Sequence, residues 1–147
     1  MDINVNGVSV TLTEDQLKQI DLQVKRKSLK VTDRIKSYED ACADQNIDPI
    51  ESKPFKNPSN VRQERSNANW ELMIICDDLN EGVTMVKYWQ PYFNFKNGKI
   101  VSFRFVIYGG WDDGCCYTSV GLSVHSQELG AYLGTQFLET FKRANNK

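Results

Sequence analysis

The first stretch of the chain alternates apolar and polar residues on both sides of Asn6-Gly7, over residues 3–12. An Asn-Gly pair favours a type I′ turn, because both central residues of that turn need a positive φ. The pattern therefore predicts a β-hairpin. Thr13 follows as a helix N-cap, and Gln16 stands three residues later, the spacing of a capping box. A helix is therefore expected to begin directly after the hairpin.

Leu17, Ile20 and Val24 form a narrow apolar stripe on that predicted helix. The helix ends in Lys25-Arg26-Lys27, which suits the negative C-terminal end of the helix dipole. The hairpin and helix together predict an N-terminal module over residues 1–31. Such a module is too small to be stable alone. It must dock on the remainder of the chain, pair with another copy, or stay mobile.

The remainder, residues 32–147, is expected to form one core domain. Its pattern predicts a helix over 33–45 and a loop over 46–62, which carries three prolines. A strongly apolar helix is predicted over about 66–80. Gly82 is placed to end this helix in the left-handed conformation.

The second half of this domain has the pattern of an antiparallel sheet. Strands over 92–96 and 99–108 flank a second hairpin signal, Asn97-Gly98, and a further strand is predicted over 117–124. A final helix over 126–143, capped by Ser126, carries a stripe that can lie across one face of the sheet. The expected fold class is α+β, with a three- to four-stranded antiparallel meander sheet packed by the helices over 66–80 and 126–143.

The bulk composition excludes few functions. The 147 residues are 40% hydrophobic and 25% charged, which are ordinary values for a globular protein. The formal net charge of −1 does not indicate nucleic acid or an anionic membrane as a partner. No apolar run approaches the length of a membrane span, and no secretory signal is visible at the N-terminus. These features predict a cytoplasmic protein.

The four cysteines do not predict a metal site. Cys42 and Cys76 lie in helical patterns, where a small buried thiol is the simplest interpretation. Cys115 and Cys116 are adjacent, no C-x-x-C spacing occurs, and the chain has one histidine. A zinc site would need further ligands. No cofactor and no metal are therefore expected, and reduced thiols fit a cytoplasmic address.

Several short segments resemble a group of small proteins encoded by Bacteroides-type phages and related bacterial genomes. The matching segments are Glu39-Asp40-Ala41-Cys42, Leu79-Asn80-Glu81-Gly82, Gln90-Pro91-Tyr92-Phe93-Asn94, Val120-Gly121, Ser126-Gln127-Glu128-Leu129, and the series Tyr132, Gly134, Gln136, Phe137. The opening from Asn6 to Thr13 is also similar, whereas Val83 replaces a tryptophan of the pattern. The resemblance implies a phage or mobile-element origin and a place in the host bacterial cytoplasm or the virion. It supplies no activity and no site residue.

The glycine-rich loop over 109–117 is the most unusual stretch of the sequence. It contains Trp111, Asp112, Asp113 and Tyr117. Paired carboxylates can bind a divalent cation or act in acid–base chemistry. Two adjacent aspartates are more often turn formers, because their side chains bond the local backbone. The turn is the favoured interpretation.

Two further chemistries stay open. His125 could form a nucleophilic pair with Cys115 or Cys116. The simpler interpretation is that His125 is a polar residue beside the Ser126 cap, without a chemical role. Aromatic residues near Trp89 could stack on the bases of single-stranded nucleic acid. Against this, the chain is not basic, and aromatic residues at alternate strand positions usually belong to the core.

The leading hypothesis is a phage-associated accessory protein that acts through protein–protein contact, in host takeover, in blocking defence, or as a minor virion component. The proposed contact residues are Trp89, Trp111, Asp112, Asp113, Tyr117 and His125, with the aromatic residues as anchors. A host or phage protein is the expected partner, and homo-oligomerisation is open. The first alternative is a single-stranded nucleic-acid-binding module. The second is a small enzyme that uses His125 with a nearby cysteine or aspartate.

Overall fold

A computed structural model describes residues 2–83, 88–96, 99–108 and 122–145. The chain divides into two compact units, residues 1–34 and residues 35–147. The predicted Asn97-Gly98 turn, the loop over 109–116 and residues 117–121 of a predicted strand lie outside the described residues.

The first unit begins with the predicted hairpin. Strands β1 (Asp2–Val5) and β2 (Val8–Thr11) pair antiparallel. Asn6 and Gly7 have φ values of 52° and 83°, so both central residues take the left-handed conformation that this turn requires. The Asn4 side-chain oxygen accepts the Gly7 N–H at 2.9 Å and holds the turn from within. The hairpin prediction is confirmed.

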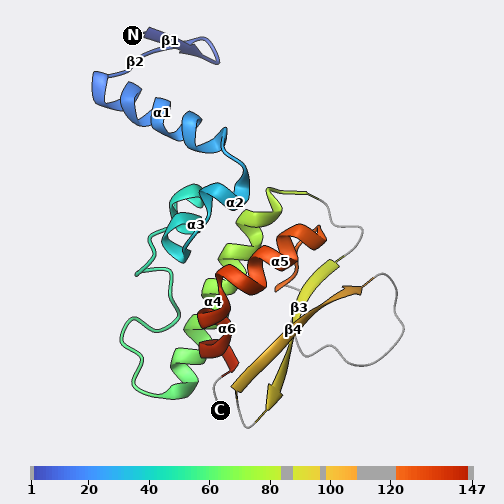
Figure 1. Cartoon of the computed structure of the whole chain (residues 1–147). Coiled ribbons are helices and arrows are strands. Elements are labelled where there is room, and N and C mark those ends of the chain that lie inside the picture. Colours follow the sequence, from blue (N-terminus) through green and yellow to red (C-terminus); the bar gives the residue numbers. More distant parts are fainter. Residues whose placement is uncertain (1, 84–87, 97–98, 109–121, 146–147) are drawn as a thin grey trace. The chain divides into compact units, whose positions relative to one another are not determined.

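Helix α1 (Glu14–Lys27) follows, and its capping box is confirmed. The Thr13 hydroxyl accepts the Gln16 N–H at 3.2 Å, and the Gln16 side chain accepts the Thr13 N–H at 2.9 Å. A short helix, α2 (Val31–Arg34), completes the unit (Figure 1).

The second unit opens with helix α3 (Tyr38–Gln45), so the single helix predicted over 33–45 is wrong. The Ser37 side chain accepts the Asp40 N–H, and together they form a second capping box that starts a new helix. The carbonyls just before this start have partners outside the helix. Tyr132 donates its hydroxyl to the Ile35 carbonyl, and Gln136 donates to the Lys36 carbonyl. These bonds stabilise the break.

Helix α4 (Val61–Asn80) is the central helix of this unit and packs against α3 and α6. It begins earlier than the sequence predicted, because the Asn60 side chain accepts the Gln63 N–H and caps it. Its end is as predicted, with Gly82 at a φ of 71°. Glu81 is also left-handed, with a φ of 47°.

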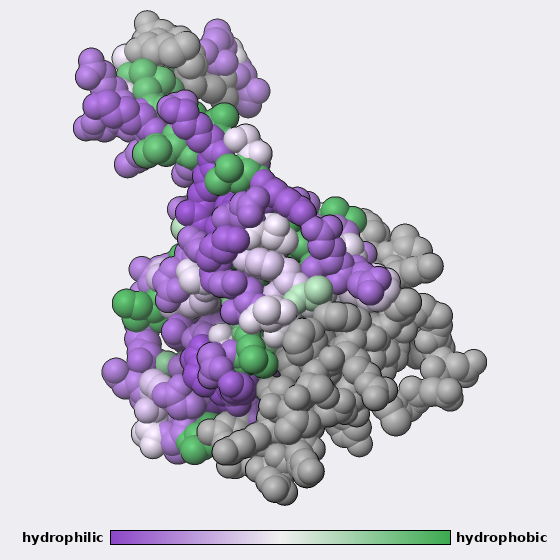
Figure 2. All heavy atoms as spheres, in the orientation of Figure 1, coloured by the Kyte–Doolittle hydropathy of each residue, from purple (hydrophilic) through white to green (hydrophobic). Residues whose placement is uncertain are grey.

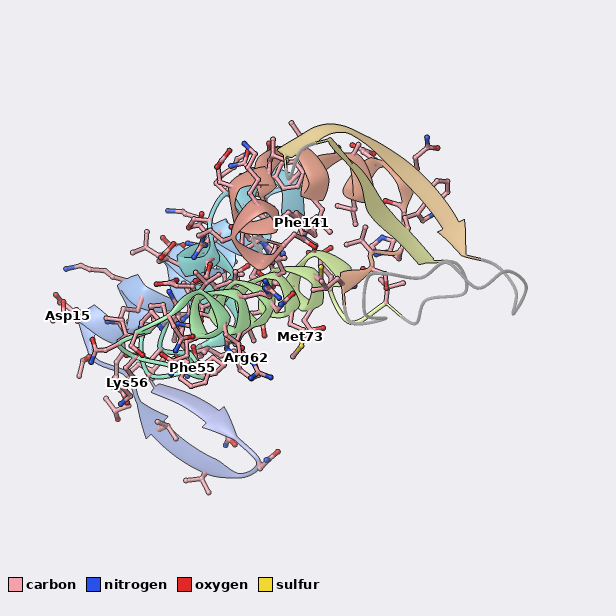
Figure 3. All side chains as sticks on the ribbon, turned by 90° about the horizontal axis from the view of Figure 1, so that it is seen from below. Asp15, Phe55, Lys56, Arg62, Met73 and Phe141 are labelled. Atoms are coloured by element: carbon pink, nitrogen blue, oxygen red, sulfur yellow. The ribbon has the colours of Figure 1, made fainter. Side chains whose placement is uncertain are left out.

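The predicted C-terminal helix over 126–143 is two helices, α5 (Gln127–Gln136) and α6 (Leu138–Asn145). The Ser126 cap is confirmed, but the chain bends at Phe137, whose φ of −107° and ψ of 24° are not helical. Helix α5 packs against β3 and β4, while α6 packs on α4. Figure 3 shows Phe141 on the α6 side of α4 and the partly exposed Met73 on the opposite side.

Strands β3 (Tyr88–Lys96) and β4 (Lys99–Tyr108) form a second antiparallel hairpin. The predicted third strand over 117–124 contributes one described residue to pairing, Val124, which exchanges both backbone hydrogen bonds with Trp89. The Asn80 side chain binds the backbone on either side of Val124, since it donates to the Ser123 carbonyl and accepts the His125 N–H. Within residues 122–125, the pairing with β3 is limited to this one bridge.

The predicted α+β class with a three- to four-stranded antiparallel meander sheet is wrong. Over the described ranges the protein is mainly helical, and its strands pair only as two separate two-stranded hairpins. The core of the described residues is supplied mainly by the helices of the second unit. Its largest fully buried side chains are Phe141, Ile35, Leu72, Ile75, Leu79, Leu133 and Val124. Cys42 and Cys76 are buried free thiols, as the sequence predicted.

Candidate interaction surface

The contact residues proposed from the sequence are only partly within the described structure. Trp111, Asp112, Asp113 and Tyr117 lie outside it. Trp89 is half-buried at the start of β3, with its backbone paired to Val124. Val124 directly precedes His125, which is the last of the six proposed contact residues. Trp89 therefore lies beside the chain segment that holds His125, while the proposed anchor role of all these residues stays a prediction.

His125 is held by the end of α4. Asn80 accepts the His125 N–H at 3.0 Å and donates to the Ser123 carbonyl at 2.9 Å. Because Asn80 is 7% exposed, this pair of bonds is well shielded from water. The His125 side-chain Nδ1 is buried and finds no hydrogen-bond partner among the described residues. His125 lies next to Ser126, so its position agrees with the simpler interpretation of a polar residue that flanks the N-cap of α5.

The described thiols do not suit nucleophilic chemistry. Burial raises the pKa of the Cys42 thiol, and burial also raises the pKa of Cys76 well above its usual range. A cysteine nucleophile acts as the thiolate, so a raised pKa works against it. Cys115 and Cys116, the proposed partners of His125, lie outside the described residues. The enzyme hypothesis therefore gains no support from Cys42 or Cys76.

An ion-pair cluster around Glu71 was not found from the sequence. The Glu71 carboxylate is almost fully buried on α4, 2.9 Å from the Lys53 Nζ, and it also accepts two hydrogen bonds from the Arg143 guanidinium. Three chain segments meet there: the loop before α4, α4 and α6. The available signal was a glutamate between Trp70 and Leu72, in the middle of an apolar helix. Since both cations are engaged by one carboxylate, the cluster holds the fold together.

Tyr38 adjoins this cluster. The Lys53 ammonium lies 5.1 Å above the Tyr38 ring, and the Tyr38 hydroxyl shares a hydrogen bond of 2.7 Å with Ser52. Burial, with the neighbouring Cys42 side chain as the second cause, raises the pKa of Tyr38 to about 12. At neutral pH Tyr38 is therefore a neutral packing residue, since its phenol stays protonated.

An open hollow of about 270 Å³ lies at the start of α4 and is lined by Asn60, Val61, Glu64 and Arg143. Arg143 is already bound to Glu71. The negative charge of Glu64 offsets the positive charge of Arg143 in the lining of the hollow. The hollow therefore has no net charge that would select an ionic ligand.

The first unit presents a different kind of feature, a set of exposed apolar side chains. None of the residues of α1 is buried. Large apolar side chains of the hairpin, of α1 and of the following turn are more than a third exposed, namely Val8, Val10, Ile20, Leu22, Val24 and Leu29. We call these six residues the N-terminal apolar surface. Figure 2 shows green, hydrophobic groups among hydrophilic neighbours in the part of the molecule that holds this unit.

Charge is distributed unevenly along the helix that carries part of this surface. The first turn of α1 holds Glu14 and Asp15, and the last turn holds Lys25, Arg26 and Lys27. This arrangement complements the helix dipole at both ends, so it stabilises α1 as a single helix. It also gives α1 an acidic end and a basic end, with apolar residues between them.

Comparison of the chain with protein-family models, with curated proteins and with solved structures gives no match. The resemblance to phage-encoded proteins therefore stays a prediction. In the described part of the chain, no helix is both long and apolar enough to cross a membrane. Across the same residues, no three metal-ligating side chains gather into a group.

Proposed function

We propose that this protein is an accessory protein that acts through protein–protein contact, with the N-terminal apolar surface as its contact element. One observation carries the proposal: the hairpin, α1 and the turn that follows expose six large apolar side chains, while α1 buries none of its own. Apolar side chains that gather at the surface are typical of sites where another molecule binds. The resemblance to phage-encoded proteins makes a bacterial host or phage protein the partner of choice.

The rest of the described chain supports a binding role over a catalytic one. The cations beside Glu71 are engaged in an ion pair, and the buried thiols have raised pKa values. The second unit therefore supplies a stable helical body, and the contact chemistry lies in the first unit.

The test is affinity capture from a bacterial lysate with the full-length tagged chain and with a variant that carries V8T, V10T, L22Q and L29Q. Threonine keeps strand propensity and glutamine keeps helix propensity, so the variant removes apolar surface while it favours the same local structure. We expect wild type to capture a specific protein that the variant loses. The thermal unfolding of the two proteins serves as the folding control.

Two results would contradict the proposal. Equal capture by wild type and variant would remove the N-terminal apolar surface from the contact. Capture that disappears when the lysate is treated with nuclease would favour the single-stranded nucleic-acid-binding module. That module would also lose affinity steeply as salt is raised, because its contacts would be made to phosphates.

A further inference from the structure

The turn of the first hairpin places an asparagine directly before a glycine at the surface. Asn6 and Gly7 are both exposed, with φ values of 52° and 83°. Among the described residues, no atom lies within 4 Å of the position that a Cβ on Gly7 would take. Because glycine has no side chain, nothing shields the Gly7 nitrogen from the side-chain carbonyl of Asn6. Attack of that nitrogen on the Asn6 Cγ closes a five-membered ring.

We propose that Asn6 is a site of self-deamidation, and that the side chain of Asn4 restrains the reaction while the hairpin is closed. In this reaction the Gly7 N–H gives up its proton, and the nitrogen forms a bond to the Asn6 Cγ. The bond from Cγ to Nδ2 breaks, and the amide group leaves as ammonia with a proton from the solvent. Water then opens the resulting succinimide at either carbonyl and leaves aspartate or isoaspartate at position 6. Nothing is oxidised or reduced, since the net change exchanges ammonia for water.

The restraint is a single hydrogen bond. The Asn4 Oδ1 accepts the Gly7 N–H at 2.9 Å. The lone pair of a peptide nitrogen is delocalised over the peptide bond, so the nitrogen attacks only after its proton is removed. A hydrogen bond donated by that N–H favours the protonated form and opposes this step. The same bond also fixes the orientation of the Gly7 peptide group, so the reaction has to wait until the turn opens.

A second left-handed asparagine shows that the backbone conformation alone does not create such a site. Asn46 has a φ of 55°, close to the value of Asn6. It is followed by Ile47, whose β-branched side chain crowds its own backbone nitrogen. The Ile47 N–H also donates to the Cys42 carbonyl at 2.8 Å. Asn46 is therefore an internal control within the same chain, expected to keep its amide.

The two products affect the hairpin differently. Aspartate leaves the backbone unchanged, and an aspartate before glycine suits the same type of turn. Isoaspartate carries the chain through the side-chain carboxyl and adds a carbon to the backbone between Val5 and Val8, which pair directly across the turn. Strands of four residues have few pairs to hold their register. We therefore expect isoaspartate to separate β1 from β2 and to displace Val8 and Val10 of the N-terminal apolar surface.

The test follows the full-length chain at mildly alkaline pH by peptide mass spectrometry, with fragmentation that assigns the change to Asn6. Each chain is measured in its native state and in concentrated urea, because urea removes the fold and keeps the sequence. One ordinary hydrogen bond corresponds to about a fivefold change in rate. We expect Asn6 of wild type to react at least about fivefold more slowly in the native state than in urea, and Asn46 to stay intact in both.

Two variants separate the acceptor from the asparagine that carries it. Asn4→Ala removes the acceptor, so its native rate at Asn6 should rise about fivefold. Asn4→Asp keeps an oxygen in the same place, and a carboxylate accepts an N–H more strongly than an amide does. Its native rate should therefore equal or fall below that of wild type. Because Asn4→Asp preserves the bond, it tests the restraint even where alanine opens the hairpin. Each native rate is divided by the urea rate of the same variant.

Three results would overturn the proposal: equal native and urea rates in wild type, an Asn4→Ala rate no higher than wild type, or an Asn4→Asp rate as high as that of Asn4→Ala. For the separated products, NMR contacts between Val5 and Val8 should persist with aspartate at position 6 and disappear with isoaspartate. Contacts that persist in both would refute the expected opening of the hairpin. The deamidation rate does not depend on the proposed function, so either can fail while the other stands.

Discussion

The Glu71 cluster allows the cost of a single substitution to be worked out from the structure. Glu71→Gln keeps the shape of the side chain but removes its charge, so Lys53 and Arg143 lose their shared partner. Breaking a fully buried ion pair costs about 3–5 kcal/mol, because a charge is left without compensation. Here the cations can reach water, since Lys53 is 28% exposed and Arg143 is 46% exposed. We therefore expect a smaller loss, about 2 kcal/mol in the free energy of unfolding.

The assay is thermal unfolding of the full chain, followed by far-UV circular dichroism. For a unit of this size, 1 kcal/mol corresponds to about 4 °C in Tm, so Glu71→Gln is expected to lower Tm by about 8 °C. The matched control is Glu64→Gln on the same helix, because Glu64 is exposed. It should change stability by less than about 0.5 kcal/mol. An equal Tm for wild type and Glu71→Gln would refute the conclusion that the cluster holds the loop, α4 and α6 together.

Three further outcomes follow from the second unit. Tyr38→Phe should make the free energy of unfolding less sensitive to alkaline pH. The raised pKa of Tyr38 contributes stability that is fully present below about pH 10 and is lost as the pH rises through about 12. Urea unfolding from about pH 9 to 12 should therefore show a smaller loss of unfolding free energy for the variant than for wild type. Asn80→Ala leaves the Ser123 carbonyl and the His125 N–H without their partner and should lower the free energy of unfolding by about 2 kcal/mol, measured by urea titration; an unchanged midpoint would contradict it. Cys42 and Cys76 should resist a thiol-specific reagent in the native protein and react in denaturant, as followed by peptide mass spectrometry, because burial raises the pKa of both thiols.

The features that sequence predicts well in this protein are the local ones. The Asn6-Gly7 turn, the Thr13 and Ser126 caps and the left-handed Gly82 are all as expected. Each depends on the residue itself and on neighbours within a few positions, since a cap or a tight turn is closed by nearby backbone groups. Turns and caps of this kind can therefore be predicted without knowledge of the tertiary fold.

The errors arise where distant segments compete for the same backbone groups. The helix predicted over 33–45 is interrupted because Tyr132 and Gln136, far along the chain, bind the carbonyls of Ile35 and Lys36. Within residues 122–125, the predicted third strand is reduced to one bridge between Val124 and Trp89, and the Asn80 side chain binds the backbone groups on either side of Val124. Neither partner is visible in the local pattern.

The candidate surface was missed for a related reason. Contact anchors were expected among the aromatic residues, and three outcomes stayed open for the N-terminal module: docking on the remainder of the chain, pairing with another copy, or staying mobile. A period of three and four residues states which side of a helix is apolar, but not whether anything packs against it.

Asn67 gives the loop between α3 and α4 a fixed point. Its side chain accepts the Phe55 N–H at 3.0 Å and donates to the Phe55 carbonyl at 2.7 Å, in the manner of a neighbouring strand. The connection is thereby divided into two arcs that share an anchored residue, and a change of length in one arc need not be transmitted to the other. For protein engineering, each arc is a separate place to graft an epitope or a fluorescent label, while the helices on both sides keep their spacing.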